Sequence, residues 1–264
     1  RRRQYHLRYH VLDAILYIVK TGTQWRMLPG GFAPWQTVYY YFRRWREEGR
    51  IRCILSITCR SARRREGRHG EPSALIIDCQ SVPSTRVGGI SSFDAYKKVN
   101  GRKRHIAVDT QGLLWGVVVH AAGDHETQWA LQLLAPLASR LDRVETVFAD
   151  QAYQGLEEKL DRELEWDLQV VESDEGEPGF SVDPKRWIVE RTYGWLGGWR
   201  RLDREYERRT DSSEVMVHLA MLRIALNRLD QKSKQSLRDL PPASHTAGPE
   251  GTSRPRVGGP FLPV

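Results

Sequence analysis

The sequence predicts an α/β fold in which a mixed sheet is flanked by helices and preceded by a small all-α domain. Up to residue 58 the apolar residues recur with helical spacing. From residue 74 onward, short apolar runs typical of strands alternate with helical segments, and one hairpin adds an antiparallel part. A hydrophobic fraction of 40% over 264 residues is enough to fill a core, and no apolar run approaches the roughly 18 residues of a membrane span.

Charge separates the front of the chain from the rest. Residues 1–70 carry a net charge of +12, whereas residues 71–264 carry −4. Such asymmetry favours a polyanion, above all nucleic acid, as the partner of the N-terminal part. The three cysteines form neither a metal-spaced pair nor an even disulfide set, which indicates a reducing cytosol.

The N-terminal domain, residues 1–58, is expected to hold a helix over residues 8–20, a Gly- and Pro-rich turn, and a second helix from residue 35. The buried stripe of the second helix is predicted to be Val38, Tyr41, Phe42 and Trp45. This order is similar to a helix-turn-helix unit, and a helical cap with a solvated basic face is the alternative. The expected contacts with double-stranded DNA in this domain are Gln36, Thr37, Tyr40, Arg43 and Arg44.

Three further segments complete the predicted organisation. Residues 59–73 are charged and contain glycine, and we interpret them as a basic linker. Residues 74–229 form the α/β domain, with a helix that begins at Pro184 after Asp183 as its N-cap. Residues 230–264 are rich in Pro, Gly and Ser and are expected to be a disordered tail.

Two predicted strands of this domain end on an aspartate, "LIID" at Asp78 and "VFAD" at Asp150. A third acid, Glu190, lies on a predicted amphipathic helix among large side chains. Carboxylates that meet at one edge of a sheet repel each other, and bound Mg²⁺ or Mn²⁺ would remove that penalty. Two such ions suit phosphoryl transfer. Taken singly, an aspartate after a strand is more often a turn or cap residue, so spacing alone leaves both interpretations open.

Longer segments resemble the insertion-sequence transposases of the DDE superfamily. In the family's order they are "GTQWRMLP", "PWQTVYYYFRRW", "IIDCQSV", "KKVNGRKRHIAVDTQGLLWGVVVHAA", "FADQAYQG", "RWIVERTYGWLGGWRRLDREYE" and "SSEVMVHLAMLRIALNRL". The resemblance implies a ribonuclease-H-like mixed sheet, and cleavage and joining of DNA at terminal inverted repeats and target DNA. It also implies Asp78, Asp150 and Glu190 as catalytic residues and ligands of Mg²⁺ or Mn²⁺, with two ions expected.

The chain departs from the family pattern at several positions. Cys79 replaces the usual Ser, whereas Asp183 and Gly197 stand where Tyr and Lys are expected, and Arg200 or Arg201 is the candidate substitute for that Lys. Further expected DNA contacts in the α/β domain are Lys97, Lys98, Arg102, Lys103, Arg104, Arg186, Arg191, Arg200 and Arg201. A solvated hairpin edge is the alternative for the basic segment 97–104.

Other polar and aromatic residues have two interpretations each. Asp124, His125 and Glu126 either cap a helix or lie near the site, with capping favoured. His105 and His120 are expected to be structural. Helical spacing favours core packing over base stacking for Trp187, Tyr193, Trp195 and Trp199.

The expected activity is therefore that of a DDE transposase acting as a homodimer on DNA, in the bacterial cytoplasm with the nucleoid and without a membrane. The chain has no initiator Met and an irregular tail, so we expect a fragment or a reading frame cut at its start. These ends also keep an alternative open, a catalytically inactive remnant that binds repeat ends as a repressor. A host ribonuclease H or repair nuclease ranks last, because it would not need the basic front.

Overall fold

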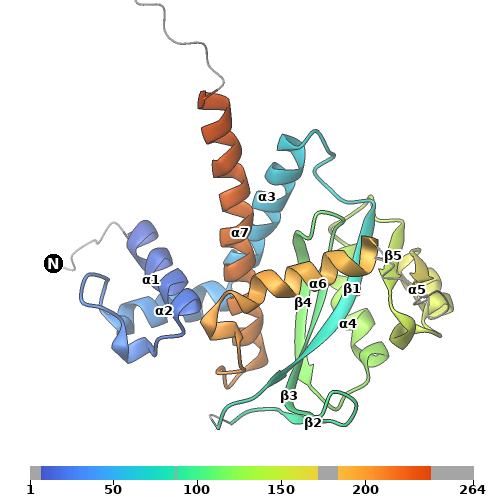
Figure 1. Cartoon of the computed structure of the whole chain (residues 1–264), viewed down its shortest axis with the longest axis horizontal. Helices are drawn as coiled ribbons and strands as arrows, with labels where there is room; N and C mark the ends of the chain where they lie inside the picture. Colours follow the sequence, from blue (N-terminus) through green and yellow to red (C-terminus); the bar gives the residue numbers. More distant parts are fainter. Residues whose placement is uncertain (1–6, 87, 172–183, 239–264) are drawn as a thin grey trace, which may run out of the picture.

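The structure is a computed structural model that describes residues 7–86, 88–171 and 184–238. Helices and strands alternate as the sequence predicts, and Figure 1 shows α1 and α2 on one side of the molecule and the sheet on the other. The elements are α1 (Leu7–Thr21), η1 (Trp25–Met27), α2 (Trp35–Glu47), α3 (Arg50–Arg65), β1 (Ala74–Pro83), β2 (Ser92–Asp94), β3 (Val99–Val108), β4 (Leu114–Ala121), α4 (Glu126–Ala138), β5 (Thr146–Ala149), η2 (Gln151–Tyr153), α5 (Glu157–Leu164), β6 (Asp167–Val170), α6 (Pro184–Gly197), η3 (Arg200–Leu202) and α7 (Thr210–Arg238).

The sheet is mixed, which confirms the predicted fold class. Its strand order is β2-β3-β1-β5-β6, with β4 paired to β3. Strands β1, β3 and β4 pair antiparallel, whereas β5 and β6 continue from β1 in parallel. Side chains alternate between the two faces of a strand, so Asp78 and Cys79 of β1 point to opposite faces. Helix α6 crosses the Asp78 face, and α4 packs on the other (Figure 1).

The structure corrects three expected boundaries. Strand β1 continues to Pro83, so Asp78 lies within the strand and not at its end. Helix α3 runs on to Arg65, because its buried stripe continues through Cys59 and Ala62 into the Arg run. Residues 59–65 are therefore helix and not linker. Helix α7 extends to Arg238, so residues 230–238 are helical as well. The expected N-cap Asp183 lies outside the described residues.

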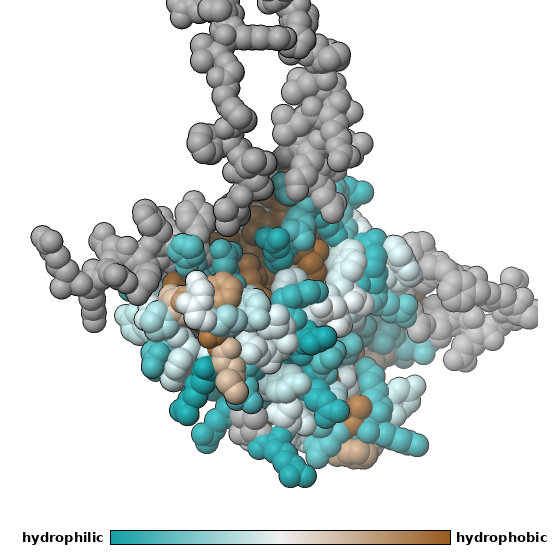
Figure 2. All heavy atoms as spheres, turned by 60° about the vertical axis from the view of Figure 1, so that its left-hand side comes forward, coloured by the Kyte–Doolittle hydropathy of each residue, from teal (hydrophilic) through white to brown (hydrophobic). Residues whose placement is uncertain are grey.

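The N-terminal helices present a polar outer surface. Val38 and Phe42 of α2 are buried, and Tyr41 and Trp45 pack partly buried against the core, as the predicted stripe requires. In Figure 2, which turns this side of the molecule forward, hydrophilic residues cover most of the visible face. No helix among the described residues has the length and apolar character that crossing a membrane would take.

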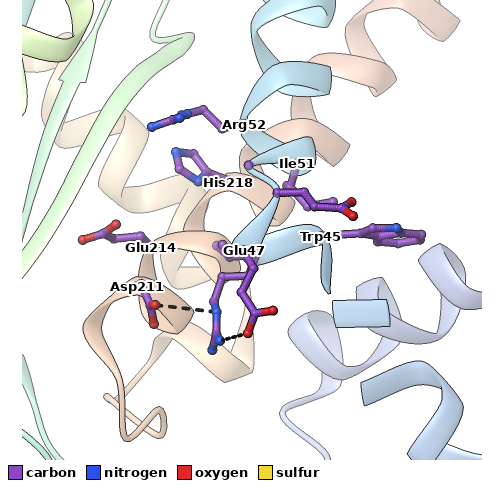
Figure 3. A pocket seen from close by; sticks show the side chains of 11 residues that line it. Trp45, Glu47, Ile51, Arg52, Asp211, Glu214 and His218 are labelled. Carbon is purple, nitrogen blue, oxygen red and sulfur yellow. Dashed lines mark hydrogen bonds and ion pairs between the residues drawn. The ribbon is translucent and has the colours of Figure 1, made fainter. Parts of the chain in front are cut away.

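A cavity of about 240 Å³ lies where the α2–α3 turn meets α7. Figure 3 shows Glu214 and His218 of α7 beside Arg52 of α3. Asp211 forms an ion pair with Arg46 (3.6 Å). Glu214 accepts a hydrogen bond from the backbone N–H of Val119 in β4 (3.1 Å). Because β4 is an edge strand, this N–H has no partner strand, and the bond to Glu214 keeps it from pairing with another chain.

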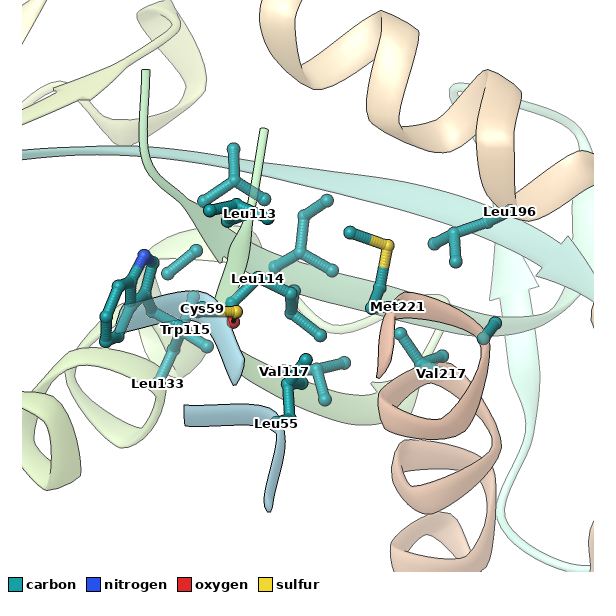
Figure 4. Packing of buried hydrophobic residues seen from close by; sticks show 14 of the residues in the cluster. Leu55, Cys59, Leu113, Leu114, Trp115, Val117, Leu133, Leu196, Val217 and Met221 are labelled. Carbon is teal, nitrogen blue, oxygen red and sulfur yellow. Dashed lines mark hydrogen bonds between the residues drawn. The ribbon is translucent and has the colours of Figure 1, made fainter. Parts of the chain in front are cut away.

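The main core lies between the sheet and the helices α3 and α7. Figure 4 shows Leu55 and Cys59 of α3 and Met221 of α7 around Leu114 and neighbouring residues of β4. The Cys59 thiol is buried and donates to the Leu114 carbonyl (3.7 Å). Because α3 shares this core, the N-terminal helices and the α/β domain are joined by continuous packing and not by a free linker.

Candidate active site

Asp78 and Asp150 are brought together by the parallel pairing of β1 and β5. The register sets Ile76 opposite Phe148, and continued by two residues it places Asp78 beside Asp150. Asp150 follows the last residue of β5 and is the N-cap of η2, where its Oδ1 accepts from the N–H of Ala152 (3.0 Å). The sheet therefore places Asp150, the residue directly after β5, next to Asp78 of the neighbouring strand β1.

Glu190 approaches from α6. Glu190, Tyr193 and Gly194 lie on one stripe of this helix and line a groove of about 450 Å³ together with Asp78. The other residues of the groove are Cys79, Gln80, Ser81 and Lys97. Two of the three predicted catalytic acids thus line one groove, and the third lies next to Asp78.

The electrostatics of Asp78 reflect this gathering of acids. The pKa of Asp78 is raised to about 7, chiefly by burial of the carboxyl and also by the nearby charges of Asp150 and Glu190. The N–H of Cys79, 2.6 Å from Asp78 Oδ1, and the ammonium of Lys97 act in the opposite direction. The protein therefore holds a carboxylate in a place where its charge is unfavourable unless a cation joins it.

The fit of this site to a divalent metal rests on donor chemistry. Among the described residues, no group of three or more His, Cys, Asp or Glu side chains has the arrangement that would hold a metal ion. The three acids supply only carboxylate oxygens, the ligands that Mg²⁺ and Mn²⁺ prefer. The raised pKa of Asp78 is the penalty that such an ion would relieve.

Tyr193 fixes α6 to the sheet one turn after Glu190. Its hydroxyl lies 2.8 Å from the carbonyl oxygen of Asp78 and 2.9 Å from that of Arg104, and donates to them. Burial raises the pKa of Tyr193 well above its ordinary value, so the phenol stays protonated. Core packing was predicted for Tyr193, but the tie to the Asp78 backbone was not, because no local pattern marks it.

The opposite face of β1 carries a buried polar cluster. The Cys79 thiol donates to Glu126 (3.1 Å), which also pairs with Lys103 (2.8 Å). Burial raises the pKa of Glu126, but the hydrogen bonds from Lys103 and Cys79 outweigh it and lower that pKa to about 2. Glu126 thus lies behind the site, and the expected capping of α4 belongs to His125, whose side chain accepts from the Thr127 N–H.

His105 belongs to the same cluster and anchors η2. Its Nε2 lies 2.6 Å from the hydroxyl of Tyr153, three residues after Asp150. Burial lowers the pKa of His105 to about 3, so the imidazole is neutral. His120 stacks on Trp129 with ring centroids 4.7 Å apart. Both histidines have the structural role that the sequence predicts.

Most of the basic hairpin residues that we expected at DNA are inside the protein. Arg102 and Arg104 are each 1% exposed and Lys103 is 5% exposed. Arg104 pairs with Glu205 (2.6 Å), and Arg102 donates to the carbonyls of Ile90, Glu207 and Arg208. The prediction of DNA contacts for these three residues is therefore wrong in this structure, as is the alternative of a solvated edge.

The other expected DNA contacts of this domain include both residues that bind partners inside the protein and residues that are exposed. Arg191 lies between the rings of Trp187 and Trp195 and donates to the Gln111 carbonyl (3.1 Å). Arg201 pairs with Glu207 (2.7 Å) and is 9% exposed, so both guanidinium groups serve the fold. Arg200 and Lys98 are exposed, and the side chain of Arg186 lies outside the described residues.

On α2 the expected DNA-contacting residues are accessible. Gln36, Tyr40, Arg43 and Arg44 are exposed, and Thr37 is half-buried. The two arginines form i,i+4 ion pairs, Arg43 with Glu47 (3.8 Å) and Arg44 with Glu48 (2.8 Å). These pairs reduce the positive charge that the helix presents.

The strand order, with antiparallel strands on one side of β1 and parallel strands on the other, gives the class of this domain as a ribonuclease-H-like α/β domain. Residues 69–227 match the family model described as "Transposase DDE domain", and residues 1–55 match "Putative transposase of IS4/5 family". The first match spans more than half of the chain, so the chain belongs to the DDE-domain transposases.

A curated relative supports the same assignment. The "Putative transposase for insertion sequence element IS402" of Burkholderia cepacia is 28% identical over 202 residues, which cover 70% of this chain and 92% of that protein. No solved structure matches the chain. The assignment to this family thus rests on sequence comparison, and the mixed sheet of the structure agrees with it.

Proposed function

We propose that this protein cleaves DNA at the terminal inverted repeats of an insertion sequence and joins the freed ends to target DNA. The observation that supports this most is the groove at Asp78. There the charges of Asp150 and Glu190 raise the pKa of a carboxyl that the fold has already buried. A site that accumulates negative charge beside a groove suits a cation-assisted reaction on a phosphodiester.

Asp78, Asp150 and Glu190 are the residues that would hold Mg²⁺ or Mn²⁺, because all of their donors are carboxylate oxygens, which suit hard cations better than softer metals. When bound, two such ions supply an activated water or 3′-hydroxyl and stabilise the leaving oxygen. The chain itself positions the acids: β1 and β5 align the aspartates, and Tyr193 holds the α6 turn that carries Glu190.

The N-terminal helices serve as the DNA-reading part in this proposal. The exposed side chains of α2 would contact the terminal repeat, and a second copy of the chain would bind the other end. Lys98, Arg200 and Arg186 remain proposed contacts with the DNA backbone. Neutralisation of several phosphates by such residues predicts that affinity falls steeply as salt rises.

The test is a nicking assay on duplexes that carry the ends of the element, with and without Mg²⁺ or Mn²⁺. Asp78→Asn, Asp150→Asn and Glu190→Gln are each expected to lower the cleavage rate by on the order of 10³-fold or more, since each removes a metal ligand. Asp142→Asn, an exposed acid away from the groove, is the matched control. Metal-dependent nicking that survives in all three site variants contradicts the proposal, and repeat binding without any nicking identifies an inactive remnant.

A further inference from the structure

The turn between β2 and β3 brings one positive charge to the groove of the acids. Lys97 lines this groove with Asp78 and Glu190, and of the described residues that line it Lys97 is the only cation. Its Nζ donates to the carbonyl oxygen of Cys79 (3.0 Å), the residue after Asp78. An ammonium has three N–H donors, so this bond leaves two for another acceptor.

The turn that carries Lys97 is held in place by a buried carboxylate. Asp94, 5% exposed, accepts from the backbone N–H groups of Tyr96 and Lys97 through Oδ1, at 3.0 Å each. Its Oδ2 accepts from the hydroxyl of Ser81 (2.6 Å). Ser81 lies on β1 three residues after Asp78, so Asp94 fixes the turn to the strand of the active site.

The turn also contains a residue with an unusual backbone conformation. Lys98 has φ of 53°, in the left-handed region that residues other than glycine rarely adopt. Holding a non-glycine residue there is unfavourable, because its Cβ comes close to the following carbonyl oxygen. The side-chain bonds of Asp94 offset such a cost and set the direction in which Lys97 leaves the turn.

We propose that Lys97 binds a non-bridging phosphate oxygen of the DNA strand that enters the groove, and that Asp94 is a positioning residue for it. This inference rests on the proposed function of the groove. A lysine tied to a neutral carbonyl beside acids is placed to bridge an anionic strand to a site that would otherwise repel it. A purely structural lysine, bound only to Cys79, is the competing explanation.

The experiment compares full-length wild type with Lys97→Met, Lys97→Arg, Asp94→Ala and Asp94→Asn on duplexes of the element's ends. Lys159→Met, an exposed lysine of α5, is the charge-matched control. Loss of a charge-assisted phosphate contact is expected to slow single-turnover cleavage by about 10- to 100-fold in Lys97→Met, with Mn²⁺ affinity unchanged. Lys97→Arg restores part of the rate, and Asp94→Asn, which keeps the turn's acceptor, retains more activity than Asp94→Ala.

Two readouts separate a phosphate contact from a structural role. A neutral methylphosphonate placed at successive positions near the cleavage point should, at one position, abolish the difference between wild type and Lys97→Met. In Ca²⁺, without cleavage, the slope of log affinity against log salt should fall by about 0.9 in Lys97→Met. An unchanged slope, or a deficit that is equal at every methylphosphonate position, overturns the proposal.

These readouts also distinguish the two proposals. If Asp78→Asn, Asp150→Asn and Glu190→Gln all cleave normally, the proposed function fails, whereas the salt slope measured in Ca²⁺ still decides the role of Lys97. If wild type cleaves with metal and Lys97→Met matches it in rate and slope, the proposed function stands and the inference about Lys97 fails.

Discussion

Two groups of charged residues lie on the same face of the sheet. One is neutralised by ion pairs within the protein, and the other consists of acids that lie close to one another. Arg104, opposite Gln80 in the register of β1 and β3, is buried in an ion pair with Glu205. Asp78, two residues from Gln80 on β1, is buried beside two further acids, and burial raises its pKa to about 7. Charge neutralised by the chain itself serves the fold, whereas charge gathered with like charge indicates where a cation and a substrate bind.

The largest effect that tests this comparison is on stability. Arg104→Met removes the nearest cation of the buried Glu205, which keeps only Arg102 (3.6 Å) and the Ser213 hydroxyl (2.6 Å) as partners. We therefore expect the free energy of unfolding to fall by about 3 kcal/mol. Asp78→Asn removes a destabilised charge and should leave stability equal or higher at pH 8. Urea unfolding monitored by tryptophan fluorescence measures both, with the exposed Arg143→Met as control.

The double variant Arg104→Met with Glu205→Gln sharpens the result. Removing both charges should recover part of the loss, because no buried carboxylate then remains and Arg102 keeps its three backbone carbonyl acceptors. If Arg104→Met is as stable as the control, or if Asp78→Asn is the less stable of the two, the division between structural and functional charge is wrong.

Local pattern sufficed for the fold class and for most strands and helices. The hairpin of β3 and β4 follows from its alternation and turn, and "VFAD" marks the end of β5. The positions of the three acids followed from resemblance to a family, and the structure adds that Asp78 is coupled to the other two. Strand pairing explains the coupling to Asp150, since β1 and β5 are adjacent in the sheet although far apart in sequence, and the packing of α6 on β1 explains the coupling to Glu190.

The roles of the basic residues could not be predicted from local sequence. Arg102 and Arg104 stand in the same basic run as Lys97, yet only Lys97 reaches the groove. Their partners, Glu205 and the carbonyls of residues 202–208, lie about a hundred residues further along the chain. A charge run gives the sign of the charge, whereas tertiary contacts decide whether it faces solvent or a buried partner.

Glu214 is a buried acid outside the groove, and its effect on stability can be tested by varying the pH. Burial raises its pKa to about 7, from 4.5, so the folded state binds the proton more tightly than the unfolded state. Its contribution to stability is therefore lost as pH rises from about 4.5 to 7. Glu214→Gln should remove this dependence and gain about 1–2 kcal/mol at pH 8, as measured by urea unfolding across pH 5–8.

Asp211, in the same cavity, is the matched control with the opposite sign. The hydrogen bond from Arg209 lowers its pKa, so its contribution is present at neutral pH and is lost as pH falls below its ordinary range near 3.8. Asp211→Asn should thus keep the loss of stability between pH 5 and 8 but move it to slightly lower pH, because the charge of Asp211 contributes to the raised pKa of Glu214. A Glu214→Gln variant that keeps the wild-type pH dependence would show that the carboxyl is solvated.

The smallest expected effect concerns the helix that bounds the groove. Gly194 lies within α6, and a Cβ added there would meet no protein atom within 4 Å. Neither packing nor backbone conformation requires glycine, so Gly194→Ala should stabilise the protein by about 0.5–1 kcal/mol. Because Gly194 lines the groove of Asp78, the added methyl group takes space from the substrate, and DNA cleavage should fall while stability rises.

Gly112→Ala gives the contrast at a glycine that the fold does require. Gly112 has φ of +75°, and its Cβ would lie 2.8 Å from the hydroxyl of Thr192, so this substitution should destabilise the protein without a direct effect on the groove. Thermal unfolding and single-turnover cleavage are measured for both variants. Gly194→Ala is expected to reduce cleavage without loss of stability, whereas Gly112→Ala is expected to reduce stability. If Gly194→Ala cleaves at the wild-type rate, the substrate does not pass over this turn of α6, and the groove must be entered from the side of Lys97.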